Sequence, residues 1–450
     1  MSDAKRFIHE HQGEIKPLIG DEEKKLKSGL DTVISDVEVS DERAGTETVD
    51  ALLERYENKL FYYEKTQFNE EARRVLLTAS DPGPYNAIRP VIQALKDDPR
   101  CNGIGALISG VGGQIFQKEF GSHFTQMKNK DTLLQDVSAL SKEKSFDVAL
   151  ASPSAYNGPE NVILFGGKSS LEIPKIFLIV DGWGGMSNIL RSEGKKNVEK
   201  IDGIFCNDEL ARDMILYALP EFSKEYVFIT GSPVFDTLKE KDPKGFREAA
   251  KEKMGLKNEA ISVLYLGDIS LDHSKGYKTD KRINEKTFEY TLNAIIKLAE
   301  AEPSREFVFL VRPHPRDSNK EELLAILNRH TSPGNLQFKS AGVKDCSMQE
   351  ARYASDIVAS IGSTENFFAR KLGRGAIFLS YPDNLGEKVL RKIYGEEILE
   401  QIGKNDPMIK VAYSPEEVTS FLSNFEKPLD EFPALETGDS VKIILDKILS

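Results

Sequence analysis

The residues best suited to chemistry follow two apolar stretches in the second half of the chain. Residues 306–311 (EFVFLV) are apolar and rich in branched side chains, which is typical of a buried strand. A turn with two prolines follows, and it carries Arg312, His314 and Arg316. The prolines end the strand and stiffen the turn, so these side chains stand at its carboxyl end. Guanidinium and imidazole groups there could bind a phosphate, and His314 could stabilise charge on a leaving group.

The second stretch, DIVASIG at 356–362, also reads as a strand and is followed by Ser363, Thr364 and Glu365. Ser and Thr just before a helix are good N-caps, and the free N–H groups behind them favour an anion. Ligands of α/β sheets bind at the carboxyl ends of strands, so the two neighbouring turns predict a site for a phosphate or a nucleotide diphosphate. Alternatively, Ser363, Thr364 and Glu365 only cap the helix and bind no ligand. Glu365 could instead accept hydrogen bonds from a ribose or a base.

Carboxylates that follow strands in the first half of the chain are candidates for a general base. Asp181 follows KIFLIV and begins the tight turn DGWGG, where it could take a proton from a hydroxyl or simply form the turn. Asp81, at the end of the first predicted strand, is a second candidate. Trp183 could stack on a sugar face or pack in the core. The sequence contains no DxD or HExxH motif, so it predicts no metal site.

The elements that must position these residues alternate between strand and helix. The first half contains predicted strands at 74–80, 103–110, 146–152, 175–182, 202–208 and 226–232, with a turn at 81–86 and a helix from residue 87. After a polar stretch at 236–258, strands follow at 262–268, 306–311, 336–340, 356–362 and 375–382. Such alternation predicts two doubly wound parallel sheets with helices on both faces, and a ligand cleft between two α/β domains. The expected division is 1–66, 67–236, 237–436 and a final amphipathic helix at 437–450, which could cross back.

The first 66 residues are charged and are predicted to form a helical extension. Apolar residues recur there at helical spacing, namely Val49, Leu52, Leu53, Tyr56, Leu60 and Phe61. This helix could be an arm for homo-oligomerisation or for docking a partner, or it could pack on the first domain.

The composition and charge exclude several classes of protein. The chain has 450 residues, 40% of them hydrophobic and 29% charged, which is the balance of an ordinary globular protein. A formal charge of −12 argues against a general nucleic-acid binder. No apolar run approaches the roughly 20 residues that a membrane span needs. Three scattered cysteines suggest a reducing compartment, and the expected location is the cytoplasm.

Four segments resemble the GT-B superfamily of glycosyltransferases, which has two Rossmann-like domains across a cleft. ITGSPVFDTL (229–238) and VLYLGD (263–268) are similar to the end of the first domain and the start of the second in UDP-N-acetylglucosamine 2-epimerases and their relatives. ASDIVASIGSTENFFARKLGRGAIFL (354–379) is similar to the donor-binding strand, turn and helix. RPHP (312–315) resembles the His-Pro motif of sialyltransferases and CDP-glycerol glycerophosphotransferases.

The resemblance implies roles for individual residues. In those families the His and a later Ser/Thr pair contact the donor phosphate, which gives His314, Ser363 and Thr364 that role. The first strand's end shapes the acceptor pocket, so Tyr85 and Asn86 become candidates for acceptor binding. The catalytic Asp of those families lies in an acidic-acidic-Gly pattern, of which Val180-Asp181-Gly182 supplies one acid. No metal or other cofactor is implied.

His273 is a further ligand candidate, because it lies near the position of the His-Arg motif of the 2-epimerases. Here the surroundings are LDHSKGYKTD, without the Arg or the following Glu-Asn, which counts against epimerase chemistry.

The resulting hypothesis is a metal-independent, inverting glycosyltransferase. The donor would be a nucleotide sugar of the CMP/CDP or UDP type, and the acceptor a hydroxyl of a glycan, lipid or protein. An enzyme like the 2-epimerases or the glycerophosphotransferases is one alternative. A non-catalytic nucleotide-binding scaffold that docks through residues 1–66 is the other.

Overall fold

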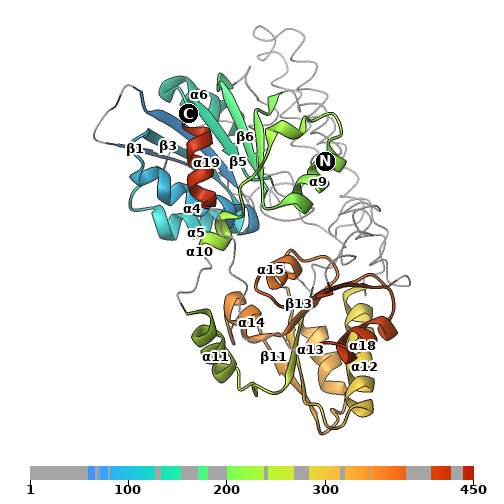
Figure 1. The fold of residues 1–450 in the computed structure, drawn as a ribbon. Helices are drawn as coiled ribbons and strands as arrows, with labels where there is room; N and C mark the ends of the chain where they lie inside the picture. The colour runs from blue at the N-terminus through green and yellow to red at the C-terminus, as the bar shows by residue number, and fades with distance from the viewer. Residues whose placement is uncertain are drawn as a thin grey trace, which may run out of the picture. The chain divides into compact units, whose positions relative to one another are not determined.

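The computed structural model describes a large part of the chain after residue 58. The described residues are 59–65, 69, 71–79, 82–126, 133–153, 171–180, 200–237, 242–267, 283–314, 320–342, 344–381, 407–426 and 439–450. They contain two sheets dominated by parallel strands and covered by helices (Figure 1). This confirms the predicted fold class.

The first sheet is built mainly from parallel strands. Among the described residues its order is β4-β1-β3-β2-β5-β6-β7-β8. The strands are β1 (Lys59–Glu64), β2 (Arg73–Ala79), β3 (Cys101–Ile108), β4 (Thr125–Gln126), β5 (Val148–Ala151), β6 (Lys175–Ile179), β7 (Gly203–Cys206) and β8 (Val227–Ile229). Among the described strand pairs of this sheet, only those of β1 with β3 and with β4 are antiparallel. The carboxyl ends of β2, β3 and β5 to β8 therefore meet at one edge of the sheet.

Helices cover both faces of this sheet. One apolar core contains α4 (Pro82–Asp97) and α5 (Gly110–Phe120). Two clusters on the other face contain α6 (Leu133–Lys144) and α9 (Glu209–Ala218). The short helix α10 (Pro233–Thr237) follows β8.

Two predictions in this part are wrong. Residues 59–64 form a strand where Leu60 and Phe61 suggested a helix, because both faces of β1 are buried and its apolar residues do not alternate with polar ones. The rest of the predicted N-terminal helix lies outside the described residues. Helix α4 begins at Pro82 rather than at Ala87, because a proline in the first turn loses no hydrogen bond.

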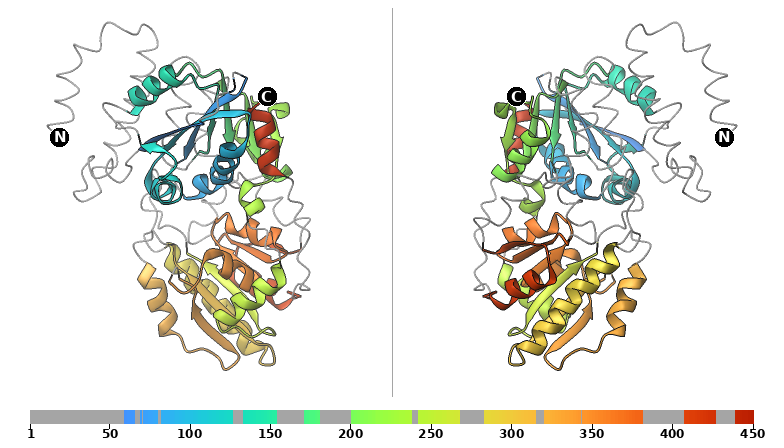
Figure 2. Two further views of the ribbon diagram at one scale, coloured as in Figure 1. Left: turned by 90° about the vertical axis from the view of Figure 1, so that its left-hand side faces the viewer. Right: turned by 90° about the vertical axis from the view of Figure 1, so that its right-hand side faces the viewer.

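The second sheet is entirely parallel, with the order β11-β10-β9-β12-β13-β14 in the described residues. Its strands are β9 (Ile261–Leu266), β10 (Phe307–Arg312), β11 (Leu336–Ser340), β12 (Ile357–Ser360), β13 (Gly375–Leu379) and β14 (Ile409–Ala412). One face is covered by α12 (Ile283–Ala301), α13 (Lys320–Arg329) and α18 (Pro415–Ser423), as Figure 2 shows. The other carries α11 (Pro243–Lys253), α14 (Met348–Ala354) and α15 (Glu365–Lys371). Strand β14 is not among the strands predicted from the sequence.

A buried ion pair fastens α11 to the amino ends of β9 and β12. Nη2 of Arg247 lies 2.5 Å from Oδ1 of Asp356, and both side chains are almost fully buried. Oδ2 of Asp356 accepts hydrogen bonds from the amide of Ser262 at 2.9 Å and from its hydroxyl at 2.8 Å. Nη1 of Arg247 donates to the carbonyls of Tyr353 and Ser355 at 2.7 and 3.1 Å. Such pairing is what makes a buried charge tolerable.

The last helix, α19 (Ser440–Ile448), lies against α4 on the first sheet (Figures 1 and 2). Its residues Ile444, Leu445 and Ile448 are buried in the core that contains α4 and α5. This packing explains why the segment alternates between apolar and charged residues at helical spacing.

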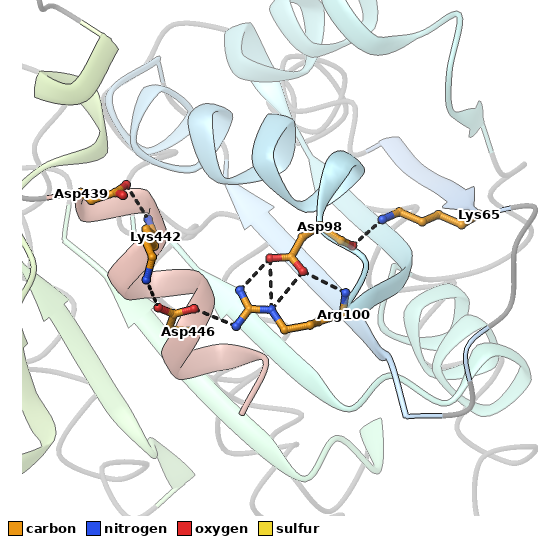
Figure 3. A network of polar contacts seen from close by, with 6 residues as sticks. All are labelled: Lys65, Asp98, Arg100, Asp439, Lys442 and Asp446. Atoms are coloured by element: carbon orange, nitrogen blue, oxygen red, sulfur yellow. Dashed lines mark hydrogen bonds and ion pairs between the residues drawn. The ribbon is translucent and has the colours of Figure 1, made fainter.

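A network of charged side chains holds α19 at its outer side (Figure 3). Arg100 pairs with Asp98 and with Asp446 of α19, both at 2.7 Å. Lys442 pairs with the other oxygen of Asp446 at 2.6 Å, and Asp439 accepts a hydrogen bond from the amide of Lys442. The hydrogen bonds from Arg100 hold the pKa of the Asp98 carboxyl below its usual value.

We expect Asp356→Asn to lower the free energy of unfolding by about 3–5 kcal/mol, because it removes the charge that pairs with the buried Arg247 guanidinium. Urea unfolding measures this change. Glu322→Gln is the matched control, since its partner Arg329 is exposed and the pair contributes less than about 1 kcal/mol. Equal effects of the two substitutions would contradict this account of Asp356.

Arg100→Gln should loosen α19 without unfolding the first sheet. The pair is partly exposed, so we expect a loss of at most about 1 kcal/mol, confined to the helix. Hydrogen exchange followed by mass spectrometry should show faster exchange in residues 440–448 and unchanged exchange in β2 and β5. Arg329→Gln, which removes an exposed pair on α13, should leave α19 unchanged.

Candidate functional site

The two turns that the sequence singled out lie at the carboxyl edge of the second sheet and flank β9. The turn with His314 follows β10, and the turn with Ser363 follows β12. Both strands pair with β9, so the turns are two strand spacings apart, about 10 Å, rather than directly adjacent. From β9 the chain adds β10 and β11 on one side of the sheet and then β12, β13 and β14 on the other, so the strand order switches between β9 and β12. Open α/β sheets bind ligands at such a switch point.

His314 is held beside the end of β9 by a close backbone contact. The amide of Gly267 donates to the carbonyl of Arg312 at 2.9 Å. A Cβ atom at Gly267 would lie 3.2 Å from the Cα of Pro313 and 3.3 Å from the amide nitrogen of His314. The glycine therefore lets the turn lie directly against β9, and His314 is half-buried there. Sequence reasoning missed Gly267; its signal was a glycine directly after the apolar run SVLYL.

The side chain of Arg312 is bound to backbone groups of the protein. Its side chain is 7% exposed, and Nη1 donates to the carbonyls of Ala341 and Cys346 at 2.6 and 3.0 Å. The guanidinium thus fixes the segment between β11 and α14 instead of standing free at the strand end. Burial raises the pKa of the Cys346 thiol, and the charge of Arg312 opposes that rise. Phosphate binding by Arg312 stays a prediction. It would have to use the N–H groups that do not bind the carbonyls of Ala341 and Cys346.

The capping of α15 differs from the predicted arrangement. Thr364 occupies the N-cap position with a helical backbone (φ −58°, ψ −19°), and its side chain makes no capping hydrogen bond. Ser363 caps instead, because its Oγ accepts the amide of Glu365 at 3.2 Å. The amide of Ser363 in turn donates to the hydroxyl of Ser360 at 3.0 Å. With seven residues, α15 is short.

Glu365 already has a cationic partner. Its Oε2 accepts a hydrogen bond from Nε of Arg352 at 2.7 Å and lies 2.5 Å from Nη2. The guanidinium of Arg352 also lies over the ring of Phe368, 4.9 Å from its centroid. Both members of the ion pair are largely buried, so this carboxylate serves the protein and does not stand free for a ribose or a base.

Tyr85 and Asn86 lie in α4 rather than in a turn. Tyr85 is fully buried, its hydroxyl donates to Glu119 at 3.0 Å, and its ring packs edge-on against Phe116. Burial and the neighbouring Glu119 carboxylate raise the pKa of Tyr85. Tyr85 was predicted to bind the acceptor, but in the structure it packs in the core. Asn86 is exposed on the helix.

The remaining candidates, Asp81, Asp181, Trp183, His273 and Arg316, lie outside the described residues. In the sequence, strand β6 ends two residues before Asp181.

No group of three or more His, Cys, Asp and Glu side chains that could hold a metal ion occurs in the described part of the chain. Among the helices that the structure describes, none is long and apolar enough to cross a membrane.

Comparisons with known proteins support the fold. Neither the known family models nor the curated proteins contain a match to this chain. Among solved structures, one from Listeria monocytogenes, assigned provisionally to UDP-N-acetylglucosamine 2-epimerase, has 13% identity and a TM-score of 0.54, over 84% of this chain and 96% of that one. The MnaA–UDP co-structure from S. aureus has 11% identity and a TM-score of 0.53 over the same shares. The UDP-N-acetylglucosamine 2-epimerase from Rickettsia bellii has 14% identity and a TM-score of 0.52, also over 84% and 96%.

The chain has the GT-B fold. The likeness covers most of the chain, including the two sheets. Identities of this size show the fold and leave the activity to the site itself.

Gly267→Ala should displace the turn that carries His314, because the added Cβ meets backbone atoms at 3.2–3.3 Å that cannot rotate away. We expect a folded protein, a loss of about 1–3 kcal/mol in stability, and a larger loss of ligand binding at this edge. Thermal unfolding and nucleotide titration measure the two effects. Gly334→Ala is the control, because a Cβ there would meet no atom within 4 Å. A Gly267→Ala protein that binds as tightly as the wild type would contradict this account.

Proposed function

We propose that this protein is a nucleotide-sugar enzyme, and that it is a metal-independent glycosyltransferase of the inverting kind. The proposal is supported above all by the switch point between β9 and β12, where Gly267 holds the His314 turn beside the carboxyl end of β9. An imidazole in that place can donate a hydrogen bond to a phosphate oxygen and stabilise charge on a departing nucleotide.

The second sheet would bind the donor, which is a nucleotide sugar of the CMP/CDP or UDP type. The MnaA–UDP co-structure lends weight to a uridine nucleotide, since it shares this fold. Ser363 and Thr364 follow β12 at the same carboxyl edge and would contribute hydroxyl or amide contacts. Arg316 would add a cationic contact to the phosphates.

Asp181 would act as the general base on the acceptor hydroxyl, with Asp81 as the second candidate. Attack on the anomeric carbon from the side opposite the nucleotide would invert its configuration. Both groups follow strands of the first sheet, which is consistent with an acceptor presented from that side of the enzyme.

A 2-epimerase is the second candidate, because the structural neighbours described above carry that name. The two activities differ in their need for an acceptor. Incubation with UDP-N-acetylglucosamine alone would yield the epimer at C2 only with an epimerase. A transferase needs a second substrate and yields an inverted glycoside.

His314→Ala should lower kcat/KM by about 10²–10³-fold if the imidazole stabilises the leaving group. The first measurement is a thermal-shift panel with CMP, CDP, UDP, GDP and ADP. A true ligand at 100 times its Kd stabilises the wild type by about 2.7 kcal/mol, and the variant should lose most of this shift.

His330→Ala is the matched control, since that imidazole lies 3.0 Å from the carbonyl of Ile326 at the end of α13. It should keep the wild-type shift. A stabilising nucleotide without turnover on any sugar donor would support the non-catalytic scaffold instead. No response to any of the five nucleotides would contradict the proposed function.

A further inference from the structure

A fully buried asparagine lies behind the turn that carries Ser363. Asn366 is the second residue of α15, and its side chain has no exposed surface. The three residues that follow it, Phe367, Phe368 and Ala369, are apolar and buried. Asparagine is seldom found in such a position, because its amide needs partners for both of its ends. The partners of Asn366 therefore indicate what this residue does.

Asn366 connects two strands of the second sheet. Its Nδ2 donates to the carbonyl of Ile377 in β13 at 3.0 Å. Its Oδ1 accepts the hydroxyl of Ser360, the last residue of β12, at 3.1 Å. The hydroxyl oxygen of Ser360, itself buried, accepts the amide of Ser363 at 3.0 Å. We call these three bonds the Asn366 series; they run without a break from β13 to the backbone of the turn.

Each bond of the Asn366 series can have only one direction. A carbonyl only accepts, so Nδ2 of Asn366 faces Ile377 and Oδ1 faces Ser360. Because Oδ1 also only accepts, the single proton of the Ser360 hydroxyl points to it. The lone pairs of Ser360 are then left for the amide of Ser363. The orientation of the turn at Ser363 is thus fixed from β13, through Asn366.

The hydroxyl of Ser363 lies at the end of this series and is half-buried, so it keeps some exposed surface. Its oxygen accepts the amide of Glu365 at 3.2 Å, and within the described residues no acceptor takes its proton. A hydroxyl in this state offers a ligand one donor. Phosphate oxygens are strong acceptors for such a donor.

We propose that Asn366 is a positioning residue for the donor nucleotide. It holds the turn so that the hydroxyl of Ser363 donates to a phosphate oxygen, and it does not touch the nucleotide itself, since its side chain is fully buried. This inference rests on the proposed function, which assigns the donor phosphates to Ser363, and it adds a residue that the sequence analysis did not select.

A double-mutant cycle tests whether Asn366 acts through Ser363. The probe is whichever of CMP, CDP, UDP, GDP and ADP stabilises the wild type most, titrated into the full chain by calorimetry. We expect Ser363→Ala and Asn366→Ala each to weaken its Kd about tenfold, and the double variant also to weaken it about tenfold. Independent residues would give about a hundredfold loss in the double variant. That result, or a wild-type Kd for Asn366→Ala, would overturn the proposal.

Asn335→Ala is the matched control, because its Nδ2 donates to three carbonyls at 2.8–3.0 Å beside the amino end of β11. It should lower the Tm, as Asn366→Ala does, and leave the Kd unchanged. Ser360→Ala interrupts the same series with a smaller change and serves if Asn366→Ala does not fold; it should also weaken the Kd about tenfold. An equal loss of affinity in Asn335→Ala would overturn the proposal, since any loss of stability would then have the same effect.

Hydrogen exchange of the ligand-free protein gives a readout that needs no nucleotide. Asn366→Ala and Ser360→Ala should speed exchange in a peptide that covers residues 361–366, and Asn335→Ala should not. Unchanged exchange in both variants would overturn the proposal. If no nucleotide binds to the wild type, the proposed function fails and the inference fails with it. A nucleotide that binds equally to the wild type and to both variants would overturn the inference alone.

Discussion

The carboxylate of Asp356 is the constraint on which the second sheet depends. A charge without access to water is tolerated only where partners surround it, so Arg247, Ser262 and the start of β12 have one permitted arrangement. That arrangement fixes the register of β9 against β12 at their amino ends. The carboxyl ends of the same strands carry Gly267 and Ser360. The switch point is thus positioned by an ion pair at the opposite end of the sheet.

The polar side chains at the carboxyl edges of the two sheets differ in their charge and in their partners. On the second sheet the charged side chains are largely engaged with the protein: Arg312 binds two carbonyls and Glu365 binds Arg352. At the edge of the first sheet, the side chains of Ser109, Ser152 and Asn207 are neutral, and the carboxylate of Asp208 caps α9.

Local patterns in the sequence were enough for the fold class and for the position of the His314 turn, because apolar runs and prolines act over a few residues. Local patterns did not predict contacts whose partner residue is distant in the sequence. The carbonyls that bind Arg312 lie about thirty residues away, and Tyr85 meets Glu119 from another helix. Strand β1 was missed because it is buried on both faces, which removes the alternation that marks a strand. Burial and pairing of this kind are properties of the assembled chain.

The place of α19 affects how the protein can fold during synthesis. Ile444 and Ile448 complete a core whose other residues begin at Phe61, and Arg100 meets Asp446 across 346 positions of sequence. The part of α4 that α19 covers therefore stays exposed until residues 440–448 have been synthesised. Contacts of such long sequence separation slow folding, and the exposed surface invites association with other chains in the meantime. The nine-residue helix α19 thus determines when the core around α4 becomes complete.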